Sequence, residues 1–411
     1  MDTGNTAWLL ISTGLVMFML PGLAFFYGGL VRRKNVLSTV MHSFFGLALV
    51  TIVWVIVGFS LAFAPGGINV PFLGGTIVGG LDFAFFNNVG MEPSTVYGTT
   101  IPFVLFAGFQ LMFAAITPAL ITGAFAERKK FASFVTFTVL WSLFIYSPLA
   151  NMVWGADGWL YKLGALDYAG GTVVHISSGV SALVAALMIG HRRKSGEKME
   201  PHDVPMVLLG AGILWFGWFG FNAGSALAAD GRAAMALMVS TVAAAAGMIS
   251  WVGVQYARTK KVSVVGAAGG AVAGLVAITP ASGFVGVGGA LIIGLVVGGL
   301  SYTMAGILRE RFKVDDALDV FAVHGVGGMW GAIATGIFAV AAVGGASGLL
   351  EGNPQQLVNQ LIAVAFTVGF SAIGTVIIMK IIDLAFGVRV PDEHEEIGLD
   401  LAIHGEAAYT A

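Results

Sequence analysis

Long apolar stretches, separated by short polar segments that hold most of the charged residues, make up the greater part of this 411-residue chain. Most stretches are close to the roughly 20 residues that an α-helix needs to cross a bilayer. The alternation of apolar and polar residues that is typical of membrane β-barrels is absent. The pattern predicts eleven membrane-spanning helices, at Ala7–Leu30, His42–Phe63, Phe103–Ala126, Phe131–Val153, Val173–Ile189, Val204–Leu227, Ala233–Tyr256, Val264–Ile278, Phe284–Leu308, Val320–Val340 and Leu357–Ile381.

Two segments depart from this regular pattern. The eighth predicted helix is short, and residues 262–274 are rich in glycine and alanine, which suits close packing against neighbouring helices. The long connection of residues 64–102 contains much glycine and no basic residue. We expect this connection to cover the outer end of the bundle, because its apolar GGLDFAFF segment is too short to cross a membrane.

Composition agrees with an integral membrane protein. Hydrophobic residues make up 57% of the chain and charged residues only 10%, whereas soluble proteins carry about 25% charged residues. The net charge of −2 indicates neither a nucleic acid nor an acidic surface as partner, and the absence of cysteine excludes disulfides. The N-terminal sequence MDTGNTAWLL lacks the basic segment of a signal peptide, so we expect the first apolar stretch to remain as a helix.

The basic residues predict the orientation of the chain. Cytoplasmic loops carry an excess of lysine and arginine. The connections after the odd-numbered helices and the end of the eleventh hold all twenty Lys and Arg residues except Lys162 and Arg232. This distribution favours an odd number of crossings with the N-terminus outside and the C-terminus inside. We expect the inner turns ERKK (127–130) and HRRK (191–194) to be solvated.

The first five and the next five predicted helices can be superimposed as two halves of opposite orientation. PGLAFFYGG, residues 21–29, and FGWFGFNAGS, residues 216–225, share a glycine and aromatic pattern. An inverted repeat of this kind places a transport site near the membrane midplane, between the halves. The predicted fold is therefore an all-α integral membrane protein with two inverted five-helix repeats and a long eleventh helix.

Two histidines lie within the predicted membrane helices. His175 belongs to DYAGGTVVHISSG, residues 167–179, and His324 to FAVHGVGG, residues 321–328. An ionisable side chain at membrane depth is costly and usually functional, although one buried histidine can also join helices by a hydrogen bond. At corresponding positions of two halves, neutral imidazoles offer donor and acceptor nitrogens. The pair could line a narrow pore for a small polar molecule or relay a proton.

Metal and haem binding are competing interpretations of these histidines. Zinc requires three or four ligands, and the chain has no cysteine and no HxxxH or HxxE spacing on one helix. Composition leaves open a haem held by two histidines from different helices. The flanking sequences VVHISSG and AVHGVGG are not obviously shaped for a porphyrin, so a metal or haem is the less favoured interpretation.

Each histidine is preceded by a carboxylate within one to two helical turns: Asp167 precedes His175, and Asp319 precedes His324. A carboxylate at a helix N-terminus accepts backbone N–H donors and complements the helix dipole. We favour this structural capping role for both residues. Asp167 could also add negative potential at the outer mouth.

Aromatic residues form a second candidate group. Trp154 ends the fourth predicted helix, Phe113 lies inside the third, and Phe221 lies in the GWFGFN segment of the sixth. Such residues are most often packing or interface anchors. Aromatic faces also attract a desolvated cation by about 2 kcal/mol or more, and the hydroxyl of Ser225 could hydrogen-bond a small cation held there.

The end of the chain has a different composition. Residues 387–411 contain six acidic residues, one arginine and a proline, so we expect a solvated cytoplasmic tail that is ordered only against a partner. Residues 1–386 form the membrane domain. A nucleotide-binding function is not indicated, because the chain lacks a glycine-rich phosphate loop.

Several segments together resemble the ammonium transporter family, Amt/Mep, which is related to the Rh glycoproteins. They are PGLAFFYGGLVRRKN, AERKKFASF, NMVWG, LDYAGGTVVHISSG, GWFGFNAGSAL, LVAITPASGFV, DVFAVHGVGGMWG and the tail GVRVPDEHEEIGLDLAIHGEAAY. The resemblance covers nearly the whole chain, and Tyr168 stands where many members have phenylalanine. It implies a homotrimer of eleven-helix subunits in the cell membrane, each with its own pore, without a cofactor and without enzymatic activity.

The resemblance also implies roles for individual residues. Trp154, Phe113 and Ser225 match the outer site that recruits ammonium, and Phe113 with Phe221 matches a stacked gate. His175 and His324 match the histidine pair of the pore, and Asp167 matches a carboxylate beneath the recruitment site. In related proteins the cytoplasmic face binds a trimeric PII (GlnK-type) signalling protein whose loop plugs the pore.

Our hypothesis from the sequence is an ammonium transporter, with methylammonium as substrate analogue. It recruits NH4+ at the outer mouth, deprotonates it near the phenylalanine gate and conducts NH3, with or without separate H+ transfer, past the histidines. Alternatives are an ammonium sensor, an Rh-like gas channel and, from a different class, a bis-His haem redox protein of the membrane.

Overall fold

Long apolar helices account for most of the molecule in this computed structural model, which describes residues 1–193 and 200–409. Within that part of the chain, ten helical runs are long and apolar enough to cross a membrane. They coincide with ten of the predicted segments and confirm an all-helical membrane protein. The runs are built from α1 (Thr3–Leu30); α2 (Val36–Val53) with α3 (Phe59–Phe63); α4 (Phe103–Phe125); α5 (Phe131–Trp141) with α6 (Ser147–Trp154); α8 (Ser177–Ile189); α9 (Val204–Trp218); α10 (Gly231–Thr259); α12 (Val287–Glu310); α13 (Val326–Phe338); and α15 (Pro354–Phe386).

The eighth predicted segment forms the shorter helix α11 (Val264–Ile278). Its 15 residues extend about 22 Å, less than the roughly 30 Å of a bilayer's hydrocarbon core. Most of its side chains are buried, and it packs against α10 and α12. The helix therefore faces protein, and the number of eleven crossings stays a prediction.

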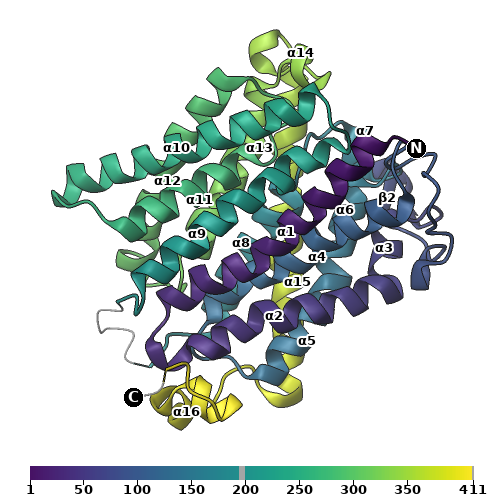
Figure 1. Cartoon of the computed structure of the whole chain (residues 1–411). Helices are drawn as coiled ribbons and strands as arrows, with labels where there is room; N and C mark the ends of the chain where they lie inside the picture. The colour runs from purple at the N-terminus through teal and green to yellow at the C-terminus, as the bar shows by residue number, and fades with distance from the viewer. Residues whose placement is uncertain (194–199, 410–411) are drawn as a thin grey trace.

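The two ends of the bundle carry different structures (Figure 1). The N-terminus lies at one end, the N-terminal face, and α16 (Asp392–Ile397) lies at the opposite end, the C-terminal face. An antiparallel pair of strands, β1 (Ile68–Val70) and β2 (Gly75–Val78), and the short helices α7 (Trp159–Leu163) and α14 (Ala341–Gly344) lie towards the N-terminal face.

The long connection of residues 64–102 covers part of the N-terminal face, the end of the bundle that the sequence predicts to lie outside. Rings from this connection and from the adjoining helices form an aromatic cluster around Phe59. Its ring centre lies 5.6 Å from those of Phe83, Phe86 and Phe103. Burial of these large rings fixes the connection on the bundle.

The C-terminal tail is ordered against its own chain, which corrects the expectation of order only with a partner. The Asp400 carboxylate accepts the N–H groups of Leu37 (3.0 Å) and Ser38 (2.8 Å) at the start of α2. The Glu395 carboxylate accepts hydrogen bonds from Arg389 Nε (2.6 Å) and the Arg193 N–H (2.9 Å). The acidic residues of the tail thus satisfy donors on the bundle and within the tail itself.

The turn after α4 is buried and not solvated as predicted. Glu127, Arg128 and Lys129 are at most 1% exposed. Arg128 donates hydrogen bonds to four backbone carbonyls, including that of Asp315, and burial lowers its pKa to about 10. In the second basic turn Arg192 is also buried and pairs with Asp315 (2.6 Å); Lys194 and Lys198 lie outside the described residues.

Candidate functional site

Three of the predicted site residues lie in π-helical turns. His175 belongs to η6 (Gly171–Ile176), which leads into α8, and His324 to η9 (Phe321–Gly325), which leads into α13. Phe221 belongs to η7 (Phe219–Ala223), which follows α9. Such wider turns occur frequently at functional sites in proteins.

Glycines allow the two histidine-bearing helices to cross at backbone distance. Gly179 follows His175 by four residues, and Gly328 follows His324 by four. A Cβ on Gly179 would lie 2.1 Å from the Gly325 nitrogen, and one on Gly328 would lie 3.0 Å from the His175 Cβ. The glycines that end the segments DYAGGTVVHISSG and FAVHGVGG thus allow this crossing.

The crossing brings the two imidazoles into direct contact. The Nδ1 atoms of His175 and His324 lie 3.2 Å apart, and the ring centres lie 5.3 Å apart at an interplanar angle of 23°. Both side chains are buried, with 1% and 4% of their surface exposed. The rings leave no room for an iron and a porphyrin between them, so a haem held by this pair does not fit.

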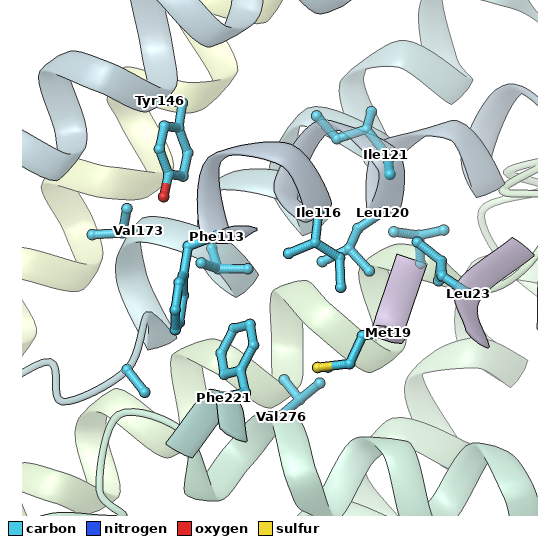
Figure 2. Close-up of a cluster of buried hydrophobic side chains, with 14 of the residues drawn as sticks. Met19, Leu23, Phe113, Ile116, Leu120, Ile121, Tyr146, Val173, Phe221 and Val276 are labelled. Carbon is cyan, nitrogen blue, oxygen red and sulfur yellow. The ribbon is translucent and has the colours of Figure 1, made fainter. Parts of the chain in front are cut away.

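Aromatic rings continue from the histidines towards the N-terminal face. The ring centres of Phe113 and Phe221 are 4.3 Å apart and the ring planes are tilted by 40°, and Figure 2 shows the two rings next to each other. Phe221 lies 5.9 Å from His175, and Phe113 lies 6.2 Å from Trp154 with its ring nearly perpendicular. Residues from four separate helical runs thereby form one continuous row of rings.

Ser225 and Trp154 are half-buried at the ends of their helical runs. The Ser225 hydroxyl donates to the Phe221 carbonyl (2.8 Å), which leaves its lone pairs free to accept a hydrogen bond. The Trp154 indole N–H donates to the Asp167 carbonyl (2.9 Å). The indole ring is thus held in place beside the loop that precedes His175.

A narrow cavity lies beside the histidines and Phe221. The room for the centre of a water-sized molecule is about 10 Å³, close to the minimum that holds a single water. Apart from the two histidines, the residues that line the cavity are apolar or aromatic. The lining consists of Met19, Leu23, Phe26, Ile116, Leu120, Val174, His175, Leu214, Trp218, Phe221, Val272 and His324.

Two aromatic residues of the site were missed by sequence reasoning. Trp218 stacks on His175 with ring centres 5.6 Å apart and donates its indole N–H to Thr279 Oγ1 (2.9 Å). Phe109 packs edge-on against Phe113 at 4.9 Å. The GWFGFN segment contained a signal for Trp218, since an aromatic residue one helical turn before another occupies the same face.

Asp167 has the capping role that the sequence predicted. Its carboxylate accepts the backbone N–H groups of Gly170, Gly171, Thr172 and Val173 at 2.6–3.2 Å and the Thr172 hydroxyl. These are the free donors at the start of η6. The carboxylate therefore fixes the helix end that carries His175.

The structure corrects the capping role expected of Asp319. Its carboxylate pairs with the Arg309 guanidinium (3.2 Å), and its backbone has a φ of 56°. The cap is Asp316, whose carboxylate accepts the Phe321 N–H (2.8 Å). Asp316 precedes His324 by eight residues, as Asp167 precedes its histidine, so the equivalent carboxylate is one turn earlier than predicted.

Comparison with known proteins places the chain in a family. The profile of the Ammonium Transporter Family matches residues 7–409. The ammonium transporter of Bacillus subtilis is 49% identical over 411 residues, which cover 100% of this chain and 99% of that protein. Amt1 of Archaeoglobus fulgidus is 47% identical over 100% of both chains.

Solved structures show the same fold. The crystal structure of Saccharomyces cerevisiae Mep2 superimposes with a TM-score of 0.88 at 37% identity, over 96% of this chain and 88% of that one. A protein described as a sensor Amt protein gives a TM-score of 0.88 at 30% identity, over 97% and 98%. The chain therefore belongs to the ammonium transporter family and is a multi-pass protein of the cell membrane.

Proposed function

We propose that this protein carries ammonium by stripping NH4+ of its proton and conducting NH3. Trp154, Phe113 and Ser225 hold the cation at the N-terminal face, and deprotonation occurs at the gate formed by Phe113 and Phe221. Neutral ammonia then passes His175 and His324. The physical reason is desolvation, because a bare cation in a narrow apolar passage is costly and a neutral molecule is not.

The observation that carries this proposal is the continuous row of rings from Trp154 through Phe113 and Phe221 to the histidine pair. It ends in a cavity of single-molecule size. The faces of these rings favour a cation at the entrance. Beyond them the lining is apolar, so only a small neutral molecule gains access at low cost.

The histidine pair supplies the polar contacts that ammonia needs. When one Nδ1 donates to the other across the 3.2 Å contact, the donor ring keeps an unprotonated Nε2 and the acceptor ring keeps an Nε2–H. The pair therefore offers one acceptor and one donor, whichever ring carries which proton. The buried His175 Nε2 has no partner among the described residues, as expected for an atom that meets the substrate.

Replacing both histidines tests the proposal. We expect H175L/H324L to reduce methylammonium uptake at least tenfold or to lose discrimination of NH4+ against K+, because both polar contacts in the passage are removed. Uptake in a transport-deficient strain and charge flux on solid-supported membranes measure the two effects. The charge flux also shows whether a proton accompanies each ammonia molecule.

A buried histidine outside the cavity provides the matched control. His42 in α2 is 2% exposed and packs on Phe134 (4.4 Å between ring centres), and it does not line the cavity. H42L should retain uptake. Unchanged uptake and selectivity in H175L/H324L would refute a direct role of the pair.

A sensor function is a second candidate, since a protein described as a sensor Amt shares the fold over nearly its full length. A sensor would bind ammonium with little flux. Methylammonium uptake by the wild type favours a transporter, and ammonium binding without uptake favours a sensor.

We also propose the assembly that the family resemblance implies. Three copies form a homotrimer with the N-terminal face outside the cell. The C-terminal face, with its basic connections and the tail of residues 387–411, lies inside and binds a PII-type signalling protein. The excess of Lys and Arg in the connections at that face supports this orientation.

A further inference from the structure

One glutamine of α15 binds the backbone of the segment that leads to Asp167. The Gln360 Oε1 atom accepts the Leu166 N–H (2.6 Å), and Gln360 Nε2 donates to the Leu166 carbonyl (2.8 Å). Gln360 Nε2 also donates to the Ala332 carbonyl of α13 (2.9 Å). The side chain is 0% exposed. This amide group thus joins three parts of the bundle: α15, α13 and the connection between α7 and η6.

The orientation of the Gln360 amide is unique. A flipped amide would place its NH2 group against the Leu166 N–H and its oxygen against two carbonyls, so donors would face donors and acceptors would face acceptors. The same connection is held at Gly164, whose carbonyl accepts a hydrogen bond from Gln356 Nε2 (2.9 Å). Gln356 precedes Gln360 by one helical turn and is 7% exposed. We call Gln356 and Gln360 the glutamine clamp.

The glutamine clamp lies next to the carbonyl that orients Trp154. The Asp167 carbonyl accepts the Trp154 indole N–H (2.9 Å), and the Trp154 ring meets the Phe113 ring edge-on, with 6.2 Å between the ring centres. The peptide group between Leu166 and Asp167 is planar, and Gln360 binds its oxygen. Only the φ and ψ angles of Asp167 therefore separate the peptide group that Gln360 binds from the one that bonds Trp154.

Other contacts hold the far side of Asp167. Its carboxylate accepts four backbone N–H groups at the start of η6, and the Tyr168 N–H donates to the Pro280 carbonyl (3.1 Å). These contacts do not involve the clamp, so the helix end that carries His175 keeps its cap when the clamp is lost. The clamp holds the near side, where the chain enters Asp167 from α7.

We infer that Gln360 is a positioning residue for the cation-recruitment site, an inference that rests on the proposed function. By fixing the peptide group before Asp167, Gln360 keeps the Trp154 indole in place for the cation. Because the amide is neutral, it does so without adding a charge beside a cation site. Loss of the clamp leaves the Leu166 N–H and carbonyl without these partners, and the connection shifts to satisfy them. Recruitment of the cation then weakens, whereas the passage beyond it keeps its geometry.

The test is the concentration dependence of methylammonium uptake by transport-deficient cells that carry the wild type, Q360M, Q356M, T375V or W154F. Uptake is normalised to the amount of folded protein in the membrane. Methionine is similar in length to glutamine but donates no hydrogen bond. Q360M should raise KM about two- to tenfold, the factor that the loss of one hydrogen bond produces, and leave the maximal rate nearly unchanged. Q356M removes a single bond to the connection and should raise KM less.

Thr375 provides the matched control on the same helix. It lies fifteen residues beyond Gln360, about 22 Å along α15. Its hydroxyl donates to Ser181 Oγ of α8 (2.8 Å), and both side chains are 0% exposed. T375V therefore removes a buried hydrogen bond of α15 that does not reach the connection, and it should keep the wild-type KM. A rise in KM that T375V shares with Q360M would overturn the inference, since it indicates a general effect of lost buried bonds.

A double-mutant cycle shows whether Gln360 acts through Trp154. W154F keeps an aromatic ring but removes the indole N–H, so the Asp167 carbonyl no longer orients this ring. We expect W154F to raise KM, and Q360M to add little in the W154F background, because residues that act through one contact are not additive. An equal effect of Q360M in both backgrounds would overturn the inference, as would a fall in maximal rate without a rise in KM.

The remaining outcomes separate this inference from the proposed function. If W154F leaves KM unchanged, Trp154 does not recruit the cation, and the proposed recruitment site and the inference fail together. A raised KM in W154F with wild-type KM values in Q360M and Q356M refutes the inference alone. If Q360M does not reach the membrane as folded protein, the milder Q356M and the double mutant Q356M/W154F supply the same comparison.

Discussion

At the scale of single residues, Lys129 is the clearest conflict between side chain and environment. It is 1% exposed, and its Nζ lies 3.7 Å from the ring centre of Phe125 and 3.9 Å from that of Phe137. The Nζ has no hydrogen-bond partner among the described residues. Burial lowers the pKa of this lysine well below its usual value. The two rings offset only part of the cost of an unpaired buried amine.

We therefore expect K129M to stabilise the protein by about 1 kcal/mol at pH 7. Methionine has similar length, carries no charge and packs well on aromatic rings. Thermal unfolding in detergent, followed by the loss of the monodisperse peak, measures the change. Lys130, which is half-buried and whose Nζ donates to the Phe386 carbonyl (2.7 Å), is the control, and K130M should not stabilise.

The stabilisation should also depend on pH. The folded-state pKa of Lys129 lies below the unfolded value of about 10.4, so the unfolded chain binds more protons between these two values. Wild-type stability therefore rises with pH in this window, and the advantage of K129M should shrink between pH 7 and pH 10. An advantage that grows with pH would contradict this account.

At the scale of elements, the crossing of the η6–α8 and η9–α13 segments decides the geometry of the site. The close approaches of Gly179 to the Gly325 nitrogen and of Gly328 to the Gly171 carbonyl are contacts between backbones. They set the 3.2 Å distance between the histidine Nδ1 atoms. A Cβ added at Gly179 would clash with backbone atoms of Gly325, so no side-chain rotation can relieve the clash.

We expect G179A to separate the two helices, to destabilise the protein by about 1–3 kcal/mol and to reduce uptake strongly. Gly212, inside α9, has nothing within 4 Å of an added Cβ. G212A should therefore be neutral or stabilising by up to about 1 kcal/mol, because alanine favours helix more than glycine does. Normal uptake in G179A would show that the site tolerates a wider crossing.

At the scale of the whole molecule, buried ion pairs join the connections at the C-terminal face. Arg192 bonds Asp315 (2.6 Å) and lies 3.6 Å from Glu127, which also pairs with Arg32 (2.7 Å). These residues belong to four different connections along the chain. Burial raises the pKa of the Asp315 carboxyl, but hydrogen bonds and the charge of Arg192 lower it to about 2.

Breaking one of these buried ion pairs should destabilise the connections at the C-terminal face. We expect R192M to cost about 3–5 kcal/mol, because Asp315 is left as a buried unpaired charge, and R192M/D315L to recover most of the loss. The Asp315 pKa is depressed from about 3.9 in the unfolded chain, so the stabilisation is complete above about pH 4. It is lost as the pH falls through about 2. In R192M the burial that raises the pKa of the Asp315 carboxyl is no longer offset by Arg192, so protonation of this carboxyl stabilises the folded mutant and the gap between wild type and R192M should narrow as the pH falls. A gap that widens between pH 8 and pH 5 would contradict this account.

Sequence reasoning identified several residues that the structure brings together, but not their geometry. His175, His324 and Asp167 were identifiable because charged or polar groups inside apolar segments are rare and stand out. Asp319 was assigned wrongly because proximity in sequence does not show which carboxylate meets the helix end. Trp218 resembled an ordinary packing residue, since its contact with His175 comes from a different helix.

The sequence by itself determined that this chain is a bundle of membrane helices and which polar groups enter it, because burial of apolar length and the cost of buried charge are properties of local composition. Only the tertiary structure decided that the helices cross at Gly179 and Gly328, that the histidines share a hydrogen bond and that the tail folds on its own chain. These features depend on distances between segments that are remote in sequence. Such distances follow from the packing of the whole bundle, which no single segment encodes.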